Sequence, residues 1–166
     1  MIFVGIDPGL TGGIAALDKQ GVPLFIGAFR PNANEFDMNQ LCDILTNLRC
    51  DHSNTSRLVI GLEHVHAMPK QGVSSTFKFG STFGKIQGIL AAKHLAYELI
   101  RPQEWMGVML AGEPKEMKKE RAKNVAVRLF PDINFRATER SHTVHSGMAD
   151  AVLIAEYLRR KLNGNP

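Results

Sequence analysis

Two apolar segments that each end in a single acidic residue place the strongest constraint on the fold of this chain. Residues 2–6, Ile-Phe-Val-Gly-Ile, run directly into Asp7, and residues 58–62, Leu-Val-Ile-Gly-Leu, run into Glu63. A continuous apolar run without polar alternation is typical of a strand covered on both faces, as in a parallel sheet. We therefore expect a central sheet in which Asp7 and Glu63 lie at neighbouring strand ends, within reach of a common cation.

The remaining segments alternate between strand-like and helix-like patterns. Residues 12–18 and 22–29, joined by the turn Lys-Gln-Gly, are predicted to form two further strands of an antiparallel meander, and residues 97–100 a short strand. Residues 101–106 are predicted to form a turn. Apolar residues at helical spacing predict helices near residues 35–49, 82–95, 115–130 and 147–162.

Length and composition are those expected of one folded domain with a modest basic excess. The chain has 166 residues, whereas domains usually have about 100–200. Its 20 Lys and Arg against 16 Asp and Glu give a net charge of +4, which favours a nucleic-acid partner only weakly. No apolar run approaches the roughly 18 residues that cross a bilayer, and no signal peptide is recognisable. We expect a cytoplasmic protein with no membrane partner and with Cys42 and Cys50 as reduced thiols.

A third acidic residue, Asp150, lies near the start of the last predicted helix. The apolar residues of this segment recur at helical spacing, which places Asp150 beside a buried stripe and lets it face the sheet. Each acid also has a structural interpretation: Asp7 as a turn residue before Pro8, Glu63 as a hydrogen-bonded edge carboxylate, and Asp150 as a favourable charge at a helix N-terminus. A buried carboxylate without a partner is costly, however, so a cation or a proton must compensate its charge.

Basic residues are concentrated in the last third of the chain. The stretch holds Lys115, Lys118, Lys119, Arg121, Lys123 and Arg128, followed by Arg136, Arg140, His142 and His145. Such a local excess suits the neutralisation of nucleic-acid phosphates. The alternative is a solvated helix face on which Glu113, Glu116 and Glu120 pair with the basic residues at helical spacing.

The motifs that carry these acids resemble the RuvC-type Holliday junction resolvases, a family of the RNase H-like (retroviral integrase) superfamily. They are D-P-G at residues 7–9, L-E-x-V at 62–65, S-S-x-F-x-F-G at 74–80 and A-D-A-x-L-I-A at 149–155. A lone D-P-G is a weak signal, but the four motifs in this order and spacing are specific. The resemblance covers nearly the whole chain and is greater to short phage-type members than to the longer bacterial enzymes.

This resemblance implies a fold, an activity and a set of partners. The fold would be a single α/β RNase H-like nuclease domain over residues 1–166, with a five-stranded mixed sheet of order 3-2-1-4-5 flanked by helices. The activity would be cleavage of four-way or branched DNA junctions by a homodimer with two Mg²⁺ ions in each active site, for which Mn²⁺ could substitute. Asp7, Glu63 and Asp150 match the catalytic metal-binding positions, and Lys119 matches a lysine near the scissile phosphate. Carboxylates suit this role because hard divalent cations prefer oxygen ligands.

The chain departs from the family pattern at the fourth metal-site position. Bacterial members usually carry an acid or His three residues before the last Asp, where this chain has Gly147. His145 or His142 could replace that ligand, since a neutral imidazole binds Mn²⁺ readily and Mg²⁺ less well. Both could instead contact phosphate or be exposed, and Asp18 is a more distant candidate.

The segment after Glu63 is predicted to be a loop over residues 64–80 that enters the junction, as in the family. His66 occupies the position of the family's wedge aromatic residue, with Met68 as an alternative. Phosphate donors and stacking surfaces in this loop are provided by His66, Lys70, Ser74, Ser75, Phe77 and Lys78. Further contacts to the DNA backbone are expected from Lys115, Lys118 and Lys123, with Lys118 also close to the lysine position of the active site.

Two other functions remain compatible with the same residues. Because the usual fourth ligand is absent, the chain could be a non-catalytic module that binds branched DNA. It could also be an RNase H-like nuclease that acts on RNA:DNA hybrids or flaps.

Overall fold

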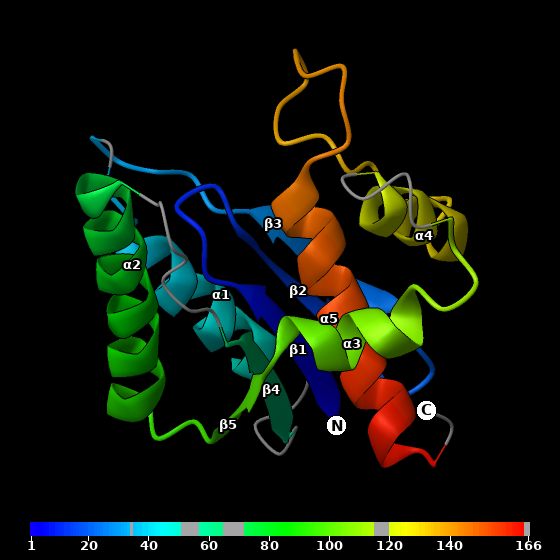
Figure 1. Ribbon diagram of the computed structural model, residues 1–166. Helices are drawn as coiled ribbons and strands as arrows, with labels where there is room; N and C mark the ends of the chain where they lie inside the picture. Colours follow the sequence, from blue (N-terminus) through cyan, green and yellow to red (C-terminus); the bar gives the residue numbers. More distant parts are fainter. Residues whose placement is uncertain (34, 51–56, 65–71, 115–119, 165–166) are drawn as a thin grey trace.

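A mixed five-stranded sheet forms the centre of the protein (Figure 1). The structure is a computed structural model, and it describes residues 1–33, 35–50, 57–64, 72–114 and 120–164. The strand order β3-β2-β1-β4-β5 confirms the predicted fold class and topology. The strands are β1 (Ile2–Asp7), β2 (Gly13–Leu17), β3 (Pro23–Ala28), β4 (Leu58–Glu63) and β5 (Tyr97–Ile100).

Pairing within the sheet agrees with the sequence patterns. Strands β1, β2 and β3 form the antiparallel meander, and β4 is parallel to both β1 and β5. Ile6 lies opposite Leu62 in the parallel β1–β4 pair. Asp7 and Glu63 are the next residues of the two strands, so both acids lie at the same carboxyl edge of the sheet.

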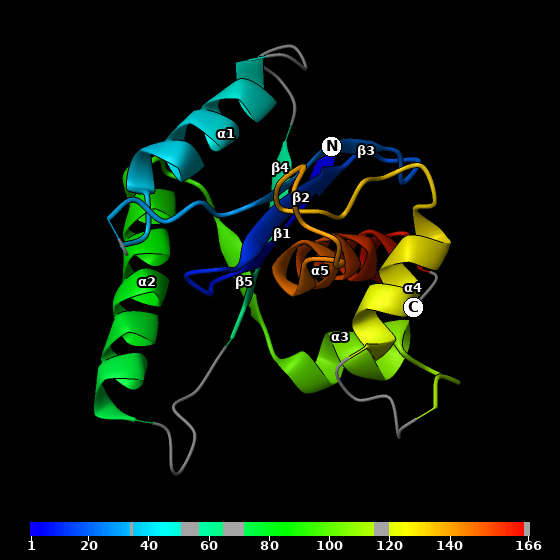
Figure 2. The ribbon, with the colours of Figure 1, turned by 90° about the horizontal axis from the view of Figure 1, so that it is seen from above.

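Helices cover both faces of the sheet, as Figure 2 shows from above. Helices α1 (Met38–Cys50) and α2 (Val73–Ala92) lie on one face, and α3 (Pro102–Met109), α4 (Arg121–Leu129) and α5 (Ser146–Leu162) lie on the other. Each layer encloses its own hydrophobic core. Among the helices of the described ranges, none has both the length and the apolar character that a bilayer crossing requires.

Glycines in β1 and β4 allow α5 to lie directly against the sheet. A Cβ atom on Gly5 would lie 2.1 Å from the carbonyl oxygen of Ala151, and one on Gly61 would lie 2.8 Å from Cδ1 of Leu158. Both α5 residues are buried. Because side chains alternate along a strand, the positions that share a face with Gly5 and Gly61 include Asp7 and Glu63.

The predicted loop over residues 64–80 is too long, because α2 begins at Val73 rather than near Thr82. The buried residues of α2 are Thr82, Ile86, Ile89 and Leu90, so the helical pattern in the sequence starts only at residue 82. The first turns expose their apolar residues: Val73 is 88% exposed and Phe77 is 76% exposed. A helix that extends past its buried face gives no periodic signal there.

The predicted turn over residues 101–106 is also wrong, since residues 102–109 form α3. Pro102 occupies the first helical turn, where its missing N–H costs no hydrogen bond. Trp105 and Met109 are buried four residues apart on one helix face. Two buried positions in a helix of this length are too few to define a helical period from the sequence.

Candidate active site

The carboxyl edge of β1 and β4 places Asp7 and Glu63 under α5. Both acids share the sheet face of Gly5 and Gly61, whose positions are covered by α5. Glu63 is only 8% exposed. Neither side chain lies where water can freely solvate a negative charge, so each requires compensation within the protein.

Asp150 lies in the second turn of α5 and faces the same edge. Its neighbour Ala151 contacts the backbone of β1 at Gly5, which brings this part of the helix over the end of the strand. Burial is the main factor that raises the pKa of Asp150 to about 7, followed by the negative charge of Glu63, whereas Lys123 lowers it. The three acids therefore come from three distant segments and interact electrostatically.

Asp7 is the most strongly perturbed of the three acids. Burial, followed by the charges of Glu63 and Asp150, raises the pKa of Asp7 well above its usual range. Its Oδ1 also accepts a hydrogen bond of 3.3 Å from the backbone N–H of Gly9, which lowers that pKa slightly. Asp7 thus makes the turn contact of its structural interpretation and also belongs to the acidic cluster.

Glu63 has a specific partner on α3. The indole Nε1–H of Trp105 donates a 2.8 Å hydrogen bond to Oε1 of Glu63. Burial raises the pKa of Glu63, and this hydrogen bond opposes that shift. Trp105 lies in the segment that the sequence pattern predicts as a turn; the available signal was a large indole in a segment that also contains Arg101, Gln103 and Glu104.

A cavity of about 620 Å³ opens beside Asp150 between α3, α4 and the start of α5. Its lining consists of Met106, Leu110, Glu120, Arg121, Ala122, Lys123, Ser146 and Asp150. Lys123 forms a 3.2 Å ion pair with the more exposed Glu120 and also acts on the charge of Asp150. Lys123, predicted only as a DNA-backbone contact, therefore lies next to the acidic cluster.

His145 is the N-cap residue of α5. Its Nδ1 accepts a 3.3 Å hydrogen bond from the backbone N–H of Met148. Burial, followed by the charge of Lys123, lowers the pKa of His145, so the ring is neutral at physiological pH. An accepting Nδ1 places the ring proton on Nε2, so metal binding through Nε2 would require that proton to leave and the cap to rearrange. The predicted role of His145 as a metal ligand stays a prediction.

Gly147 has a packing reason to lack a side chain. A Cβ atom there would lie 2.5 Å from the backbone carbon of Gly12 and 2.6 Å from its Cα. Conversely, a Cβ on Gly13 would lie 2.6 Å from the carbonyl oxygen of Gly147. The first turn of α5 and the β1–β2 turn thus meet backbone to backbone and leave no room for a side chain at position 147.

The acids do not form a complete metal site by themselves. Across the described ranges, no three His, Cys, Asp or Glu side chains are grouped closely enough to hold a metal ion. The donor set nevertheless suits a divalent cation, because buried carboxylates that raise one another's pKa are stabilised by positive charge.

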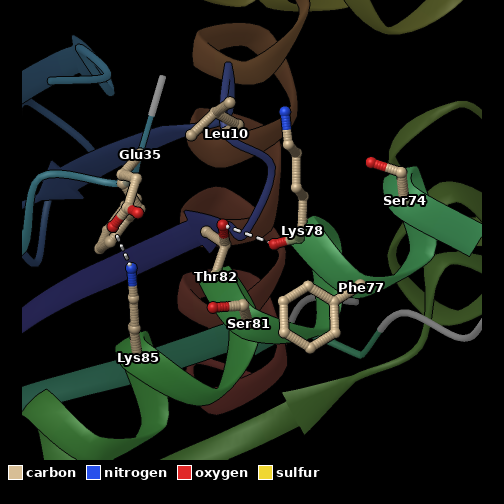
Figure 3. Close-up of a pocket in the computed structure, with 9 residues that line it drawn as sticks. Leu10, Glu35, Ser74, Phe77, Lys78, Ser81, Thr82 and Lys85 are labelled. Carbon is tan, nitrogen blue, oxygen red and sulfur yellow. Dashed lines mark hydrogen bonds and ion pairs between the residues drawn. The ribbon is translucent and has the colours of Figure 1, made fainter. Parts of the chain in front are cut away.

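Several predicted DNA-binding residues lie on α2 beside a second hollow. Ser74, Phe77 and Lys78 line a groove of about 210 Å³ that also contacts Leu10, three residues after Asp7 (Figure 3). Ser75 is exposed in the same helical turn. These residues therefore belong to a helix and not to the predicted loop. The predicted residues His66, Lys70, Lys115, Lys118 and Lys119 lie outside the described residues.

Comparison with known proteins identifies the fold. RuvC of Thermus thermophilus in complex with a Holliday junction substrate superposes with a TM-score of 0.62 at 15% identity, and the match covers 99% of this chain and 98% of RuvC. The chain has a RuvC-like fold. A second Thermus thermophilus RuvC structure gives a TM-score of 0.58 at 18% identity, with the same 99% and 98% coverage. Neither a protein-family model nor a curated protein matches the sequence.

Substitution of Gly147 tests the backbone contact between α5 and the β1–β2 turn. We expect Gly147→Ala to lower the free energy of unfolding by about 1–3 kcal/mol, because its Cβ would overlap the backbone of Gly12. Gly147→Asp should be at least as destabilising and should not increase Mg²⁺ affinity. Denaturant unfolding and calorimetric metal titration measure the two effects. As a control, Gly107→Ala in α3 has open space around its Cβ and should stabilise the protein by about 0.5–1 kcal/mol.

The acidic cluster also predicts how stability depends on pH without metal. The folded-state pKa of Asp150, about 7, exceeds the roughly 3.9 of an unfolded Asp, so the folded protein binds more protons between these values. Stability associated with Asp150 is therefore present at low pH and lost as the pH rises from about 4 to 7. In EDTA at pH 7.5, Asp150→Asn should be more stable than the wild type by on the order of 2–4 kcal/mol.

Denaturant unfolding at several pH values measures this difference. The stability gain of Asp150→Asn over the wild type should grow between pH 4 and 7 and shrink when Mg²⁺ is added. Asp132→Asn, at an exposed position, is the matched control and should show no such trend. A gain that is constant across the pH range would contradict the raised pKa of Asp150 in the folded protein.

Proposed function

We propose that the protein is a metal-dependent endonuclease that resolves four-way or branched DNA junctions by paired phosphodiester hydrolysis. The observation that carries this proposal is the convergence of Asp7, Glu63 and Asp150 at one sheet edge within a RuvC-like fold. The solved relative is described in complex with a Holliday junction substrate, which supports DNA junctions as the substrate class.

Asp7, Glu63 and Asp150 are the residues that would hold the metal. Their oxygens are the hard donors that Mg²⁺ prefers, and Mn²⁺ could substitute for it. Two bound Mg²⁺ ions would supply an activated water and charge stabilisation at the attacking and leaving oxygens. Within the protein, Glu63 is buried and Asp7 and Asp150 are partly buried, which limits the access of bulk water to their oxygens.

Lys123 is suited to act on the substrate phosphate. Its ammonium group lies in the cavity that Asp150 lines and is held by Glu120 at 3.2 Å. A cation at this position offsets negative charge that develops on the phosphoryl group during hydrolysis. Lys119, four residues earlier, remains the candidate that the family pattern implies for the same role.

The groove on α2 is suited to guide a DNA strand toward the acids. Lys78 and Ser74 provide phosphate-binding groups, and Phe77 provides an exposed aromatic surface. Leu10 forms the other side of the groove and belongs to the turn that follows Asp7. A strand in this groove would therefore run next to the acidic cluster.

A second copy of the chain is the proposed partner of the exposed face of α2. Uncharged, exposed residues follow one helix face at spacings of four and three: Gly80, Gly84, Gly88 and Ala91. A Cβ atom placed on any of the three glycines would have no neighbour within 4 Å, so another helix could approach closely. We propose that two copies pair through this face, which would present two active sites to the two symmetric strands of a junction.

Asp7→Asn tests the role of the acids in cleavage. We expect it to lower the cleavage rate of a synthetic four-way junction at least ~1,000-fold with Mg²⁺ or Mn²⁺, because a neutral amide is a poor metal ligand, and to leave junction binding intact. Cleavage is followed on denaturing gels and binding by gel shift. Asp132→Asn serves as the control for a generic loss of an acidic residue.

The same assay separates the alternative functions. Paired nicks across the junction that disappear in EDTA support the resolvase. Binding without nicks in either metal indicates a non-catalytic module, and faster cleavage of an RNA:DNA hybrid or a flap indicates the other nuclease class. An Asp7→Asn protein that still nicks the junction at the wild-type rate would refute the role given to Asp7.

Gly84→Glu tests the pairing of two copies. A charged side chain in the centre of the α2 face should convert a dimer into the 18.3 kDa monomer, as measured by sedimentation equilibrium. Gly107→Glu adds the same side chain at an open helical position on α3 and should leave the dimer intact. A wild-type protein that is monomeric at tens of micromolar would contradict the proposed interface.

A further inference from the structure

The hydrogen bond between Trp105 and Glu63 is unusual because both of its side chains are buried at the acidic cluster. Trp105 is fully buried, and Glu63 is 8% exposed. Nε1 of Trp105 lies 2.8 Å from Oε1 of Glu63, although 42 residues separate them in the chain. A buried indole N–H without a hydrogen-bond acceptor carries a desolvation penalty. A fully buried Trp therefore almost always has an acceptor.

Trp105 is itself held firmly in place. It belongs to the core formed by α3, α4, α5 and the sheet, in the company of buried residues such as Phe3, Ile100 and Leu153. Its helix begins at Pro102 and buries Met109 one turn later. The indole is therefore a rigid donor, whereas Glu63 has a flexible side chain on the last residue of β4.

The choice of Trp at this position has a chemical meaning. A Phe would fill much of the same apolar space without a donor, so the N–H is the feature that distinguishes Trp here. The donor engages one carboxylate oxygen and leaves Oε2 of Glu63 for another ligand. A donor that hydrogen-bonds one oxygen of a metal-binding carboxylate fixes the orientation of that side chain and strengthens metal binding.

We propose that Trp105 is a positioning residue for the metal site: its indole N–H holds Oε1 of Glu63 and thereby directs Oε2 toward the cation shared with Asp7 and Asp150. This inference rests on the proposed function, because it assumes that Glu63 binds metal. The inference goes beyond the proposed function by assigning a role to α3, an element that contributes no carboxylate to the cluster.

Trp105→Phe is the central variant, because it removes the N–H and keeps an aromatic ring in the core. Calorimetric titration of the DNA-free protein with Mn²⁺ should show a dissociation constant about 10–100-fold higher than that of the wild type. Cleavage of a four-way junction should require a correspondingly higher Mn²⁺ concentration, with a smaller change in the rate at saturating Mn²⁺. An unchanged affinity and metal requirement would overturn the inference.

Phe130→Leu is the matched control for a loss of core packing. Phe130 lies in the same hydrophobic core as Trp105 and is 8% exposed. Phe130→Leu should lower the melting temperature by an amount similar to that of Trp105→Phe, yet its Mn²⁺ affinity should stay within about twofold of the wild type. An equal loss of Mn²⁺ affinity in both variants would show that Trp105 acts only through stability.

A measurement on the wild type covers the case in which Trp105→Phe does not fold. Trp105 is the only Trp of the chain, so ¹⁵N-labelled protein gives one indole N–H resonance. This resonance should move as Mg²⁺ is added, saturate at the calorimetric dissociation constant, and stay unchanged in Glu63→Gln. A resonance that does not respond while Mg²⁺ binds would overturn the inference.

The two proposals fail in different ways. If the wild type neither binds divalent cations nor cleaves DNA, the proposed function is refuted, and the role of Trp105 with it. If the wild type binds Mn²⁺ and cleaves junctions, but Trp105→Phe does so equally well, only the positioning role is refuted.

Discussion

Close packing of α5 against β1 and β4 is the constraint on which the site depends. At Gly5 the backbone of α5 lies almost in contact with β1, and at Gly61 the side chains of Leu158 and Ile154 fill the space of the missing Cβ. This short separation lets an acid on the helix approach acids at two strand ends. A bulkier residue at Gly5 would lift α5 and separate Asp150 from the other carboxylates.

The same packing concentrates negative charge where solvent is scarce. Burial and mutual repulsion raise the pKa values of Asp7 and Asp150, and burial raises that of Glu63. The protein offsets part of this cost through Trp105 and Lys123, one a neutral donor and one a cation. The remaining cost destabilises the folded state, and positive charge bound at this edge of the sheet would relieve it.

Sequence patterns predicted the parts of the fold whose burial is continuous. The apolar runs that end at Asp7 and Glu63 and the helix around Asp150 all have side chains packed on the sheet, so their periodicity is visible. The first turns of α2 and the short helix α3 escaped prediction because exposed or isolated apolar residues define no period. The hydrogen bond between Trp105 and Glu63 could not be predicted from the sequence, because local sequence patterns do not show which acceptor an indole 42 residues away will contact. Lys123 was recognised as basic, but only the packing of α4 against α5 brings it to Asp150.

The contact between Gly147 and the β1–β2 turn couples the residue types that these two segments can carry. Residues 147 and 12 share a space that accommodates backbone alone. A side chain at position 147 therefore packs without overlap only if the turn takes another shape. The effect on stability of a substitution at position 147 should accordingly depend on the residues of the β1–β2 turn, so the two segments are expected to change together rather than singly.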